Sequence, residues 1–444
     1  MSHLSRSSIR DANQRTWDTL EGLVNIGNRM AGQDGEHEAA REMCRTFVDA
    51  GLDDPSIQEF DIPGWWRRSS QLVLTDPAIG TFDGPHEVIA LPGTSSGEVT
   101  AELVDVGYGD EAAFRDADLE GNIAMVSTQT PDEHHRWIHR MEKYTHAVES
   151  GATGFVFRNH VPGCLPPTGE VGYYNRPAPI PAVGVSKELG ERLLRTLADT
   201  RVTARLSVDC ENDSATSSNV YATVGPETDR EILVTAHHDA HDIAEGARDN
   251  GAGCALVAGI GHALVRIEEQ LDTRVRLMTF GAEELALNGS THYAATADTD
   301  RIRCVVNIDG SGASSTPSIR PYGFDEMTAV FETVADSVGR QLVVEDGFFP
   351  YTDAWPFVEQ GIPAVTVGSD AGTTGRGWAH TQADTLDKLD PRDLRALAVV
   401  YLDTVIELAT GEFDLTHQSS EAVRSMIDES GRAALEATGR WSTD

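Results

Sequence analysis

The feature that most constrains the fold is an alternation of apolar strands and helices that begins near Ser214 and runs to Thr410. The strand-like segments include 231–239, 274–284 and 303–310. Such alternation predicts an α/β fold, in which a mostly parallel mixed sheet is flanked by helices on both faces. Ligands of such folds bind at the carboxyl ends of the strands. We therefore expect the chemistry of this chain at those ends.

The length of the chain predicts a second, smaller domain. With 444 residues, the chain exceeds the roughly 250 to 300 residues at which single cores stop growing. Between about residues 90 and 200 the pattern changes to short strands and glycine turns, which is typical of a small β-rich domain. We expect two parts of a catalytic domain, 1–90 and 201–444, around an insert, 91–200. The second part ends in a helical tail.

Local patterns predict further elements. Apolar residues at helical spacing predict a helix over 35–50, with Gly51 as its C-cap. Short strands are expected at 56–62 and 71–74, with two tryptophans between them that serve core or interdomain packing. A helix over 137–150 is expected in the insert. The tail after Gly411 is expected to form one more solvated helix.

The charge of the chain excludes some partners. The sequence has 71 acidic and 35 basic residues, a formal net charge of -36, and its three lysines are Lys143, Lys187 and Lys388. This field opposes nucleic acid and anionic membrane surfaces, and no run approaches the roughly 18 apolar residues of a membrane helix. Because molar salt shortens the screening length to about 3 Å, the acidic surface favours a salt-loving source. The alternative is an ordinary acidic cytosolic protein.

The cysteines predict a reducing compartment. They are five in number, scattered and never in a CxxC arrangement, so they suggest neither a disulfide framework nor a cysteine zinc site. We expect them to act as small buried hydrophobic residues. The N-terminal segment 1–17 has no apolar h-region or small-residue cleavage site. These patterns predict a cytoplasmic protein.

Five metal-capable side chains follow different predicted strands or loops. They are His237, Asp249, Glu284, Asp309 and His380. Such a set can hold two divalent cations about 3.5 to 4 Å apart, with one bridging carboxylate. Glu283, beside Glu284, is then a free carboxylate that can handle a proton. The chain is therefore predicted to be a metal-dependent hydrolase.

The segment 231–241 holds three histidines. Strand alternation puts His237 and Asp239 on one face and His238 on the other. A metal-bound imidazole normally donates its second N–H to a carboxylate, so we expect His237 to bind metal and Asp239 to orient it. His238 and His241 remain the alternatives.

The acidic loops supply the remaining candidates. Asp249 lies in a glycine-rich loop where a carboxylate can bridge two cations, although an ordinary N-cap would look the same. Consecutive turn residues point in different directions, so we expect Glu284 to bind metal and Glu283 to act as general base. A solvated pair at a helix start is the alternative. Asp309 can bind the metal that Glu284 does not serve, and His380 has Asp384 and Asp387 nearby as supporting or capping groups.

Taken together, these motifs resemble the M28 family of zinc aminopeptidases and carboxypeptidases. The matching stretches are AHHDA, GARDNGAG, TFGAEELALNGS, NIDGSG, TDAWPFVEQGIPAVTVGS and HTQADTLDKLD, and DLEGNIAMVS, KYTHAVESGATGFVFRN and PIPAVGVS resemble a protease-associated domain. The resemblance implies a zinc exopeptidase (phosphorylase/hydrolase-like) fold. It also implies two Zn²⁺, with Co²⁺ or Mn²⁺ as alternatives. His237, Asp249 and Asp309 would serve one zinc, and Asp249, Glu284 and His380 the other.

The implied function is hydrolysis of a terminal peptide bond, with a peptide as substrate, and an aminopeptidase is the first choice. A carboxypeptidase or dipeptidase of the same family is the alternative, followed by a single-zinc acyltransferase of the glutaminyl cyclase type and a noncatalytic receptor. Two departures from the family stand out. Ala379 replaces a tyrosine that polarises the substrate carbonyl in some relatives. The segment 352–357 keeps Asp353 but has a tryptophan, Trp355, expected near the pocket mouth.

A second histidine cluster lies in the predicted insert. It comprises His134, His135, His139 and His146. His135 and His139 are one helical turn apart, a spacing that can bind zinc. Because no third ligand is evident, we expect instead a solvated helix face that forms a lid.

Overall fold

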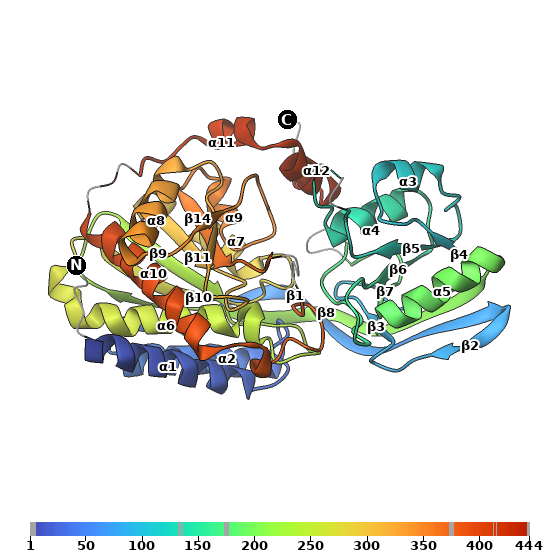
Figure 1. Ribbon diagram of the computed structural model, residues 1–444, viewed down its shortest axis with the longest axis horizontal. Coiled ribbons are helices and arrows are strands. Elements are labelled where there is room, and N and C mark those ends of the chain that lie inside the picture. The colour runs from blue at the N-terminus through green and yellow to red at the C-terminus, as the bar shows by residue number, and fades with distance from the viewer. Residues whose placement is uncertain are drawn as a thin grey trace. The chain divides into compact units, whose positions relative to one another are not determined.

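The computed structural model describes residues 6–131, 134, 136–172, 177–372, 377–411, 413 and 415–441, with side chains from residue 14 onward. The chain forms two compact units (Figure 1). The first contains the residues up to Ile62, Thr216–Ala379 and Asp384–Asp428. The second contains Pro63–Ala215, His380–Ala383 and the residues from Glu429 onward.

The first unit contains the predicted mixed sheet. Its strands are β8 (Thr203–Val224, of which the part from Thr216 belongs here), β9 (Glu231–His237), β10 (Arg274–Phe280), β11 (Ile302–Ile308), β12 (Pro317–Arg320), β13 (Val343–Val344) and β14 (Ala364–Ser369). They run in the order β13-β12-β14-β11-β9-β10-β8. The four central strands are parallel, with Phe280 of β10 opposite His237 and Asn307 of β11 opposite Thr235. Because these strands end at one edge, the residues that follow them lie close together.

Helices flank this sheet. They are α1 (Arg6–Val24), α2 (Asp34–Ala50), α6 (Ala252–Leu264), α7 (Asn288–Thr296), α8 (Asp325–Val338), α9 (Trp355–Val358), α10 (Pro391–Thr410) and α11 (Ser420–Met426). Helix α6 packs against α1, α2 and α10, α8 packs against α10, and α7 packs against α9 (Figure 1). By length and composition the stretch 247–270 could cross a membrane, but 89% of its apolar window is buried inside the protein. This stretch is therefore buried to the extent that is usual for a helix in the core of a globular protein.

The helix predicted over 35–50 is confirmed as α2, with closely matching boundaries. Helix α2 ends at Gly51, whose positive φ of 82° lets its N–H reach the carbonyls of Phe47 and Val48. The strands expected at 56–62 and 71–74 are both present, but the expected break between them is not, because β1 runs continuously over Asp53–Asp76. The alternating burial of β1 over residues 60–63 breaks at the tryptophans, where Gly64 and Trp65 are both buried. Trp65 donates to the carbonyl of Thr94.

The second unit is rich in strands, as predicted. It contains β2 (Ala78–Phe82), β3 (Val88–Ala90), β4 (Gly97–Asp105), β5 (Ile123–Ser127), β6 (Gly154–Arg158) and β7 (Ala182–Val185), with parts of β1 and β8. Strands β4, β5, β6 and β7 pair in parallel, and β3 and β8 pair antiparallel at either side. The helices are α3 (Glu111–Asp116), α4 (Arg140–Glu149), α5 (Lys187–Asp199) and α12 (Glu429–Ala437). The unit begins before and ends after the predicted insert, because β1 and β8 continue into it.

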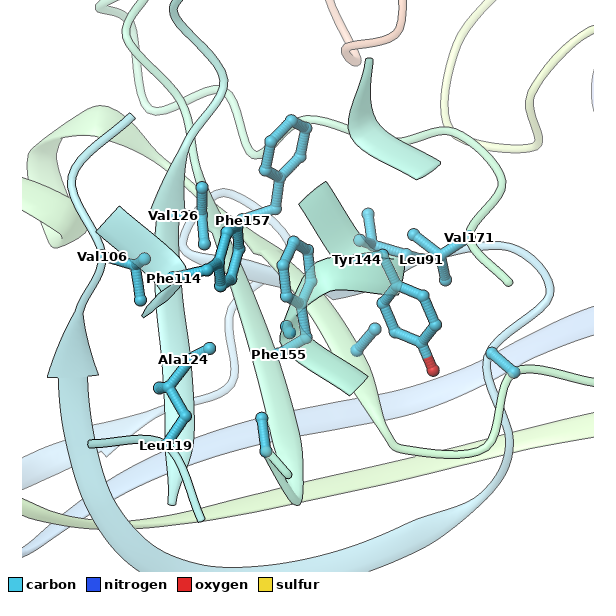
Figure 2. Packing of buried hydrophobic residues seen from close by; sticks show 14 residues of the cluster. Leu91, Val106, Phe114, Leu119, Ala124, Val126, Tyr144, Phe155, Phe157 and Val171 are labelled. Atoms are coloured by element: carbon cyan, nitrogen blue, oxygen red, sulfur yellow. The ribbon is translucent and has the colours of Figure 1, made fainter. Parts of the chain in front are cut away.

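A core of its own holds this unit together. Figure 2 shows Phe155 and Phe157 of β6 beside Tyr144 of α4. The rings of Tyr144 and Phe155 meet edge to face with centroids 5.4 Å apart, and the tyrosine hydroxyl donates to the carbonyl of Ile180 at 2.9 Å. The buried hydroxyl therefore has a partner, which avoids the cost of an unsatisfied polar group.

Two expectations for helices, one for the tail and one for the insert, are wrong. The tail is not one solvated helix, since it forms α11 and α12, and Ala434 and Leu435 of α12 are buried. The carbonyl of Ala437 accepts a hydrogen bond from Thr145 of α4 at 3.0 Å. Helix α4 is itself largely buried and not a solvated lid.

The histidines of the second cluster have separate partners. The ring of His139 caps α4 by accepting the Met141 N–H. His134 faces Asp110 at 3.6 Å, and His146 faces Glu142 at 3.6 Å. His135 lies outside the described residues. The expectation of five buried cysteines holds for Cys210, Cys254 and Cys304, whereas Cys44 is partly exposed and Cys164 exposed.

Candidate metal centre

His237 is the centre of a cluster of carboxylates. It ends β9, and its side chain is 1% exposed. Its Nε2 lies 3.2 Å from Oδ1 of Asp249, 3.7 Å from Oδ1 of Asp309 and 4.0 Å from Oε2 of Glu283. These side chains come from three different loops, at the edge where the parallel strands end. The cluster is thus produced by the sheet topology and not by local sequence.

Asp239 and His238 take different sides, as strand alternation predicts. Nδ1 of His237 lies 3.2 Å from the Asp239 carbonyl and 3.4 Å from its carboxylate. The same carboxylate accepts the backbone N–H groups of Glu283 and Glu284 at 3.1 and 3.0 Å. His238 instead points to Thr279 at 3.2 Å, and burial lowers its pKa to about 4. Asp239 therefore supports both the histidine and the glutamate turn.

Asp249 is carried by an irregular loop that begins at Gly246, with a positive φ of 58°, and ends where α6 begins. The carboxylate of Asp384 accepts the N–H of Arg248 at 2.8 Å and that of Asp249 at 3.0 Å. Burial, and then the charge of Asp249, raises the pKa of Asp384 to about 7. Asp384, predicted as a supporting group, thus holds the backbone of this loop.

Glu283 and Glu284 follow β10 and point to different partners. The Glu283 carboxylate faces His237, with its side chain 11% exposed. The Glu284 carboxylate is 4% exposed, and its Oε2 lies 2.8 Å from Nε2 of His241. His241 was an alternative to His237 in the sequence, but in the structure it joins Glu284 instead. Geometry alone would allow cation binding by His237, Glu283 and Asp309, whose ligand atoms lie within 4.8 Å of one another.

His380 groups with the second unit, together with residues 381–383. Its carbonyl accepts the N–H of Thr168 at 2.8 Å, and its Nδ1 lies 3.3 Å from the Thr168 carbonyl oxygen. Nη1 of Arg140 lies 3.5 Å from the same Nδ1, so the carbonyl and the guanidinium favour opposite tautomers of the ring. Its place among the metal ligands stays a prediction.

The chemistry of this cluster fits a divalent cation. Burial by itself lowers the pKa of His237, but the carboxylates around it, Glu283 foremost, raise that pKa well above its usual value. Burial raises the pKa of Glu283 well above its usual value, and the charges of Glu284 and Asp309 add to this. The buried Nε2 of His237 makes no hydrogen bond of good geometry to the described part of the chain. Carboxylates that repel one another surround an imidazole nitrogen that has no good hydrogen bond within the described residues. A divalent cation bound among them would neutralise the negative charge and accept the nitrogen as a ligand.

One expectation near this centre is wrong, and two residues were missed. Trp355 does not lie at a pocket mouth, since it is 2% exposed and packs edge to face against Tyr322 and Phe348. The missed residues are Arg29 and Glu36, both buried. Glu36 stands on the apolar stripe of α2, three, four and seven residues before other buried positions. An acid on an apolar stripe was the signal that could have found it.

The fold and this cluster define a mixed α/β protein with a candidate metal centre. Residues 219–405 match Peptidase family M28, and residues 99–193 match the PA domain. Residues 219–405 thus form a family M28 peptidase region, residues 99–193 form a PA domain, and the protein is a peptide-bond hydrolase. Both predicted resemblances are confirmed.

Named relatives and a solved structure agree with this placement. Aminopeptidase YwaD of Bacillus subtilis is 27% identical over 406 residues, which cover 87% of this chain and 82% of the relative. Carboxypeptidase Q of Bos taurus is 24% identical, covering 88% of this chain and 84% of the relative. The structure of a zinc aminopeptidase from Bacillus subtilis, BSAP, has a TM-score of 0.70 and 25% identity, covering 90% of this chain and 95% of that one.

Proposed function

We propose that this chain is a co-catalytic di-zinc aminopeptidase. The observation that carries the proposal is the convergence of Asp249, Glu283 and Asp309 on the buried His237 Nε2. The donor set suits Zn²⁺, with Co²⁺ or Mn²⁺ as alternatives. Following the family resemblance, His237, Asp249 and Asp309 would hold one ion, and Asp249, Glu284 and His380 the other.

The residues of the chain divide the remaining work. Two bound ions would polarise the scissile carbonyl and stabilise the negative charge that develops on its oxygen. Glu283 Oε2 takes a proton from the attacking water as its oxygen bonds to the carbonyl carbon. Glu283 then gives that proton to the amine nitrogen as the C–N bond breaks. Asp239 keeps His237 oriented and holds the backbone of the glutamate turn.

The variant Glu283→Gln tests the role of the base. Glutamine keeps the shape of glutamate but cannot accept the proton, so we expect turnover to fall by about 10² to 10⁴. The metal content should stay near two per chain. The matched control is Glu269→Gln, an exposed position away from the cluster, which should leave both quantities unchanged. Activity within tenfold of wild type in a metal-loaded Glu283→Gln protein would contradict the assignment.

The similarity to carboxypeptidase Q makes a carboxypeptidase or dipeptidase the second candidate. Aminoacyl-nitroanilides have a free amine and report aminopeptidase activity, whereas N-blocked dipeptides report carboxypeptidase activity. We expect cleavage of the first group. Cleavage of blocked dipeptides alone would reverse the polarity. A single metal with ring closure and no hydrolysis would instead favour the cyclase-type alternative, and metal binding without turnover the receptor type.

We also propose a salt-rich cytoplasm as the setting of this chain. The net charge of -36 supports a salt-adapted surface. The five cysteines are free thiols in the described structure, which is compatible with a reducing compartment.

A further inference from the structure

Glu36 is a buried acid that the proposed reaction does not use. It lies in the first turn of α2 and is 0% exposed, although an acid at a helix start is usually solvated. Its Oε1 accepts the N–H of Ala282 at 3.0 Å and the hydroxyl of Ser217 at 2.5 Å. Its Oε2 accepts the N–H of Gly32 at 2.6 Å. The carboxylate therefore ties α2 to the turn that follows β10.

That turn carries Glu283 and Glu284, and two buried carboxylates hold it. Glu36 binds the N–H of Ala282, and Asp239 binds the next two N–H groups. Three consecutive backbone donors thus have carboxylate acceptors. Ala282 has a positive φ of 55°, which is uncommon for a residue with a Cβ. The turn therefore needs outside contacts to keep this conformation.

The packing around the Glu36 carboxylate is close. A Cβ on Gly281 would lie 2.3 Å from the Ser217 hydroxyl oxygen and 2.5 Å from Glu36 Oε1. The glycine is thus required for the carboxylate to reach the backbone. Burial, and then the charge of Asp239, raises the pKa of Glu36 to about 8. The Ser217 hydroxyl can donate to the acid or accept from it, so the contact with Ala282 is kept in either protonation state.

Burying the two acids Glu36 and Asp239, each of which feels the charge of the other, is unfavourable for the stability of the fold. A hydrophobic residue at position 36 would continue the apolar stripe of α2, formed by Ala39, Ala40, Met43 and Phe47. The compensating contacts are at the turn and around it, where Glu36 accepts hydrogen bonds from the Ala282 N–H, the Ser217 hydroxyl and the Gly32 N–H.

We propose that Glu36 is a positioning residue that, together with Asp239, holds the turn 282–284 so that Glu283 faces His237 while Glu284 faces away from it. The inference rests on the proposed role of Glu283 as base. It assigns a function to helix α2, which supplies no candidate ligand.

Two substitutions separate positioning from simple structural support. Glu36→Asp keeps the carboxyl group but is one methylene shorter, so it cannot reach both Ala282 and Gly32. Glu36→Gln keeps an oxygen for Ala282 and places its amide against the Gly32 N–H. We expect kcat to fall about 100-fold in Glu36→Asp, the loss that a misplacement of about 1 Å can cause, with KM within threefold. In Glu36→Gln kcat should stay within about fivefold of wild type. Glu38→Asp, on the exposed face of the same helix, is the matched control and should behave as wild type.

Amide hydrogen exchange of the peptide 278–288 reports on the turn without any assay of activity. Exchange of this peptide should be faster in folded, zinc-loaded Glu36→Asp than in wild type, Glu36→Gln and Glu38→Asp. Unchanged exchange and kcat in Glu36→Asp would overturn the proposal. Equal losses of kcat in both Glu36 variants, in proportion to the folded fraction by circular dichroism, would also overturn it. If wild type hydrolyses no peptide, the proposed function fails, and the exchange rates still decide the role of Glu36.

Discussion

Replacing Arg29 with lysine should destabilise the first unit by a measurable amount. The buried guanidinium donates four hydrogen bonds to backbone carbonyls, at distances of 2.6 to 3.0 Å, and its acceptors are Leu23, His238, Glu245 and Gly246. Lysine has one nitrogen at its end, which can keep about one of these contacts. At about 1 kcal/mol for each of three lost hydrogen bonds, the expected loss in unfolding free energy is about 3 kcal/mol.

Urea unfolding, at a salt concentration that supports the fold, measures this loss. With a slope of about 3 kcal/mol per molar urea or more for a unit of this size, the midpoint of Arg29→Lys should fall by up to about 1 M. Arg41→Lys is the matched control, because Arg41 is half-exposed and pairs with Glu38 on the helix surface, so its midpoint should hardly change. The Asp249 loop should also loosen, which weakens metal binding. Equal midpoints for Arg29→Lys and wild type would refute the reasoning.

Two further predictions concern pH and salt. Burial lowers the pKa of Lys143 to about 7, whereas the unfolded chain keeps that proton up to about pH 10. The folded state therefore binds fewer protons over this window, and stability should rise with pH by at most about 1.4 kcal/mol per pH unit. Thermal unfolding from pH 7 to 10 should show this slope in wild type and a flatter one in Lys143→Met, and parallel curves would contradict it. Dialysis from molar to low salt should unfold the chain, because a net charge of -36 loses its screening. A circular dichroism spectrum that stays the same would count against a salt-adapted surface.

The local sequence pattern predicted the structure correctly where contacts between residues close together in the chain determine it. Helix α10 coincides with its apolar periodicity over Pro391–Thr410, and α2 ends at the glycine that its pattern indicated. Strand alternation separated His237 from His238 correctly. These features depend on contacts between residues a few positions apart, which the sequence displays directly.

Distant contacts explain the errors. The tail helix α12 has a pattern that would also suit solvent, and its burial comes from α4 in the same unit. Trp355 was expected at a pocket mouth because it stands in a segment near the site, but its aromatic neighbours Tyr322 and Phe348 enclose it. Neither partner could be read from the local sequence.

The sequence by itself determined the α/β class, the inserted β-rich domain and the identity of the acids and histidines at the strand ends, because periodicity and residue type are local properties. The tertiary structure decided which of those groups meet. Asp249, Glu283 and Asp309 lie around one imidazole. His241 lies against Glu284. Arg29 and Glu36, from the N-terminal segment, bind the backbone of the loops that carry the site. The physical reason is that hydrogen bonds and charge contacts between segments from 12 to 246 residues apart in the chain depend on how the sheet and helices pack.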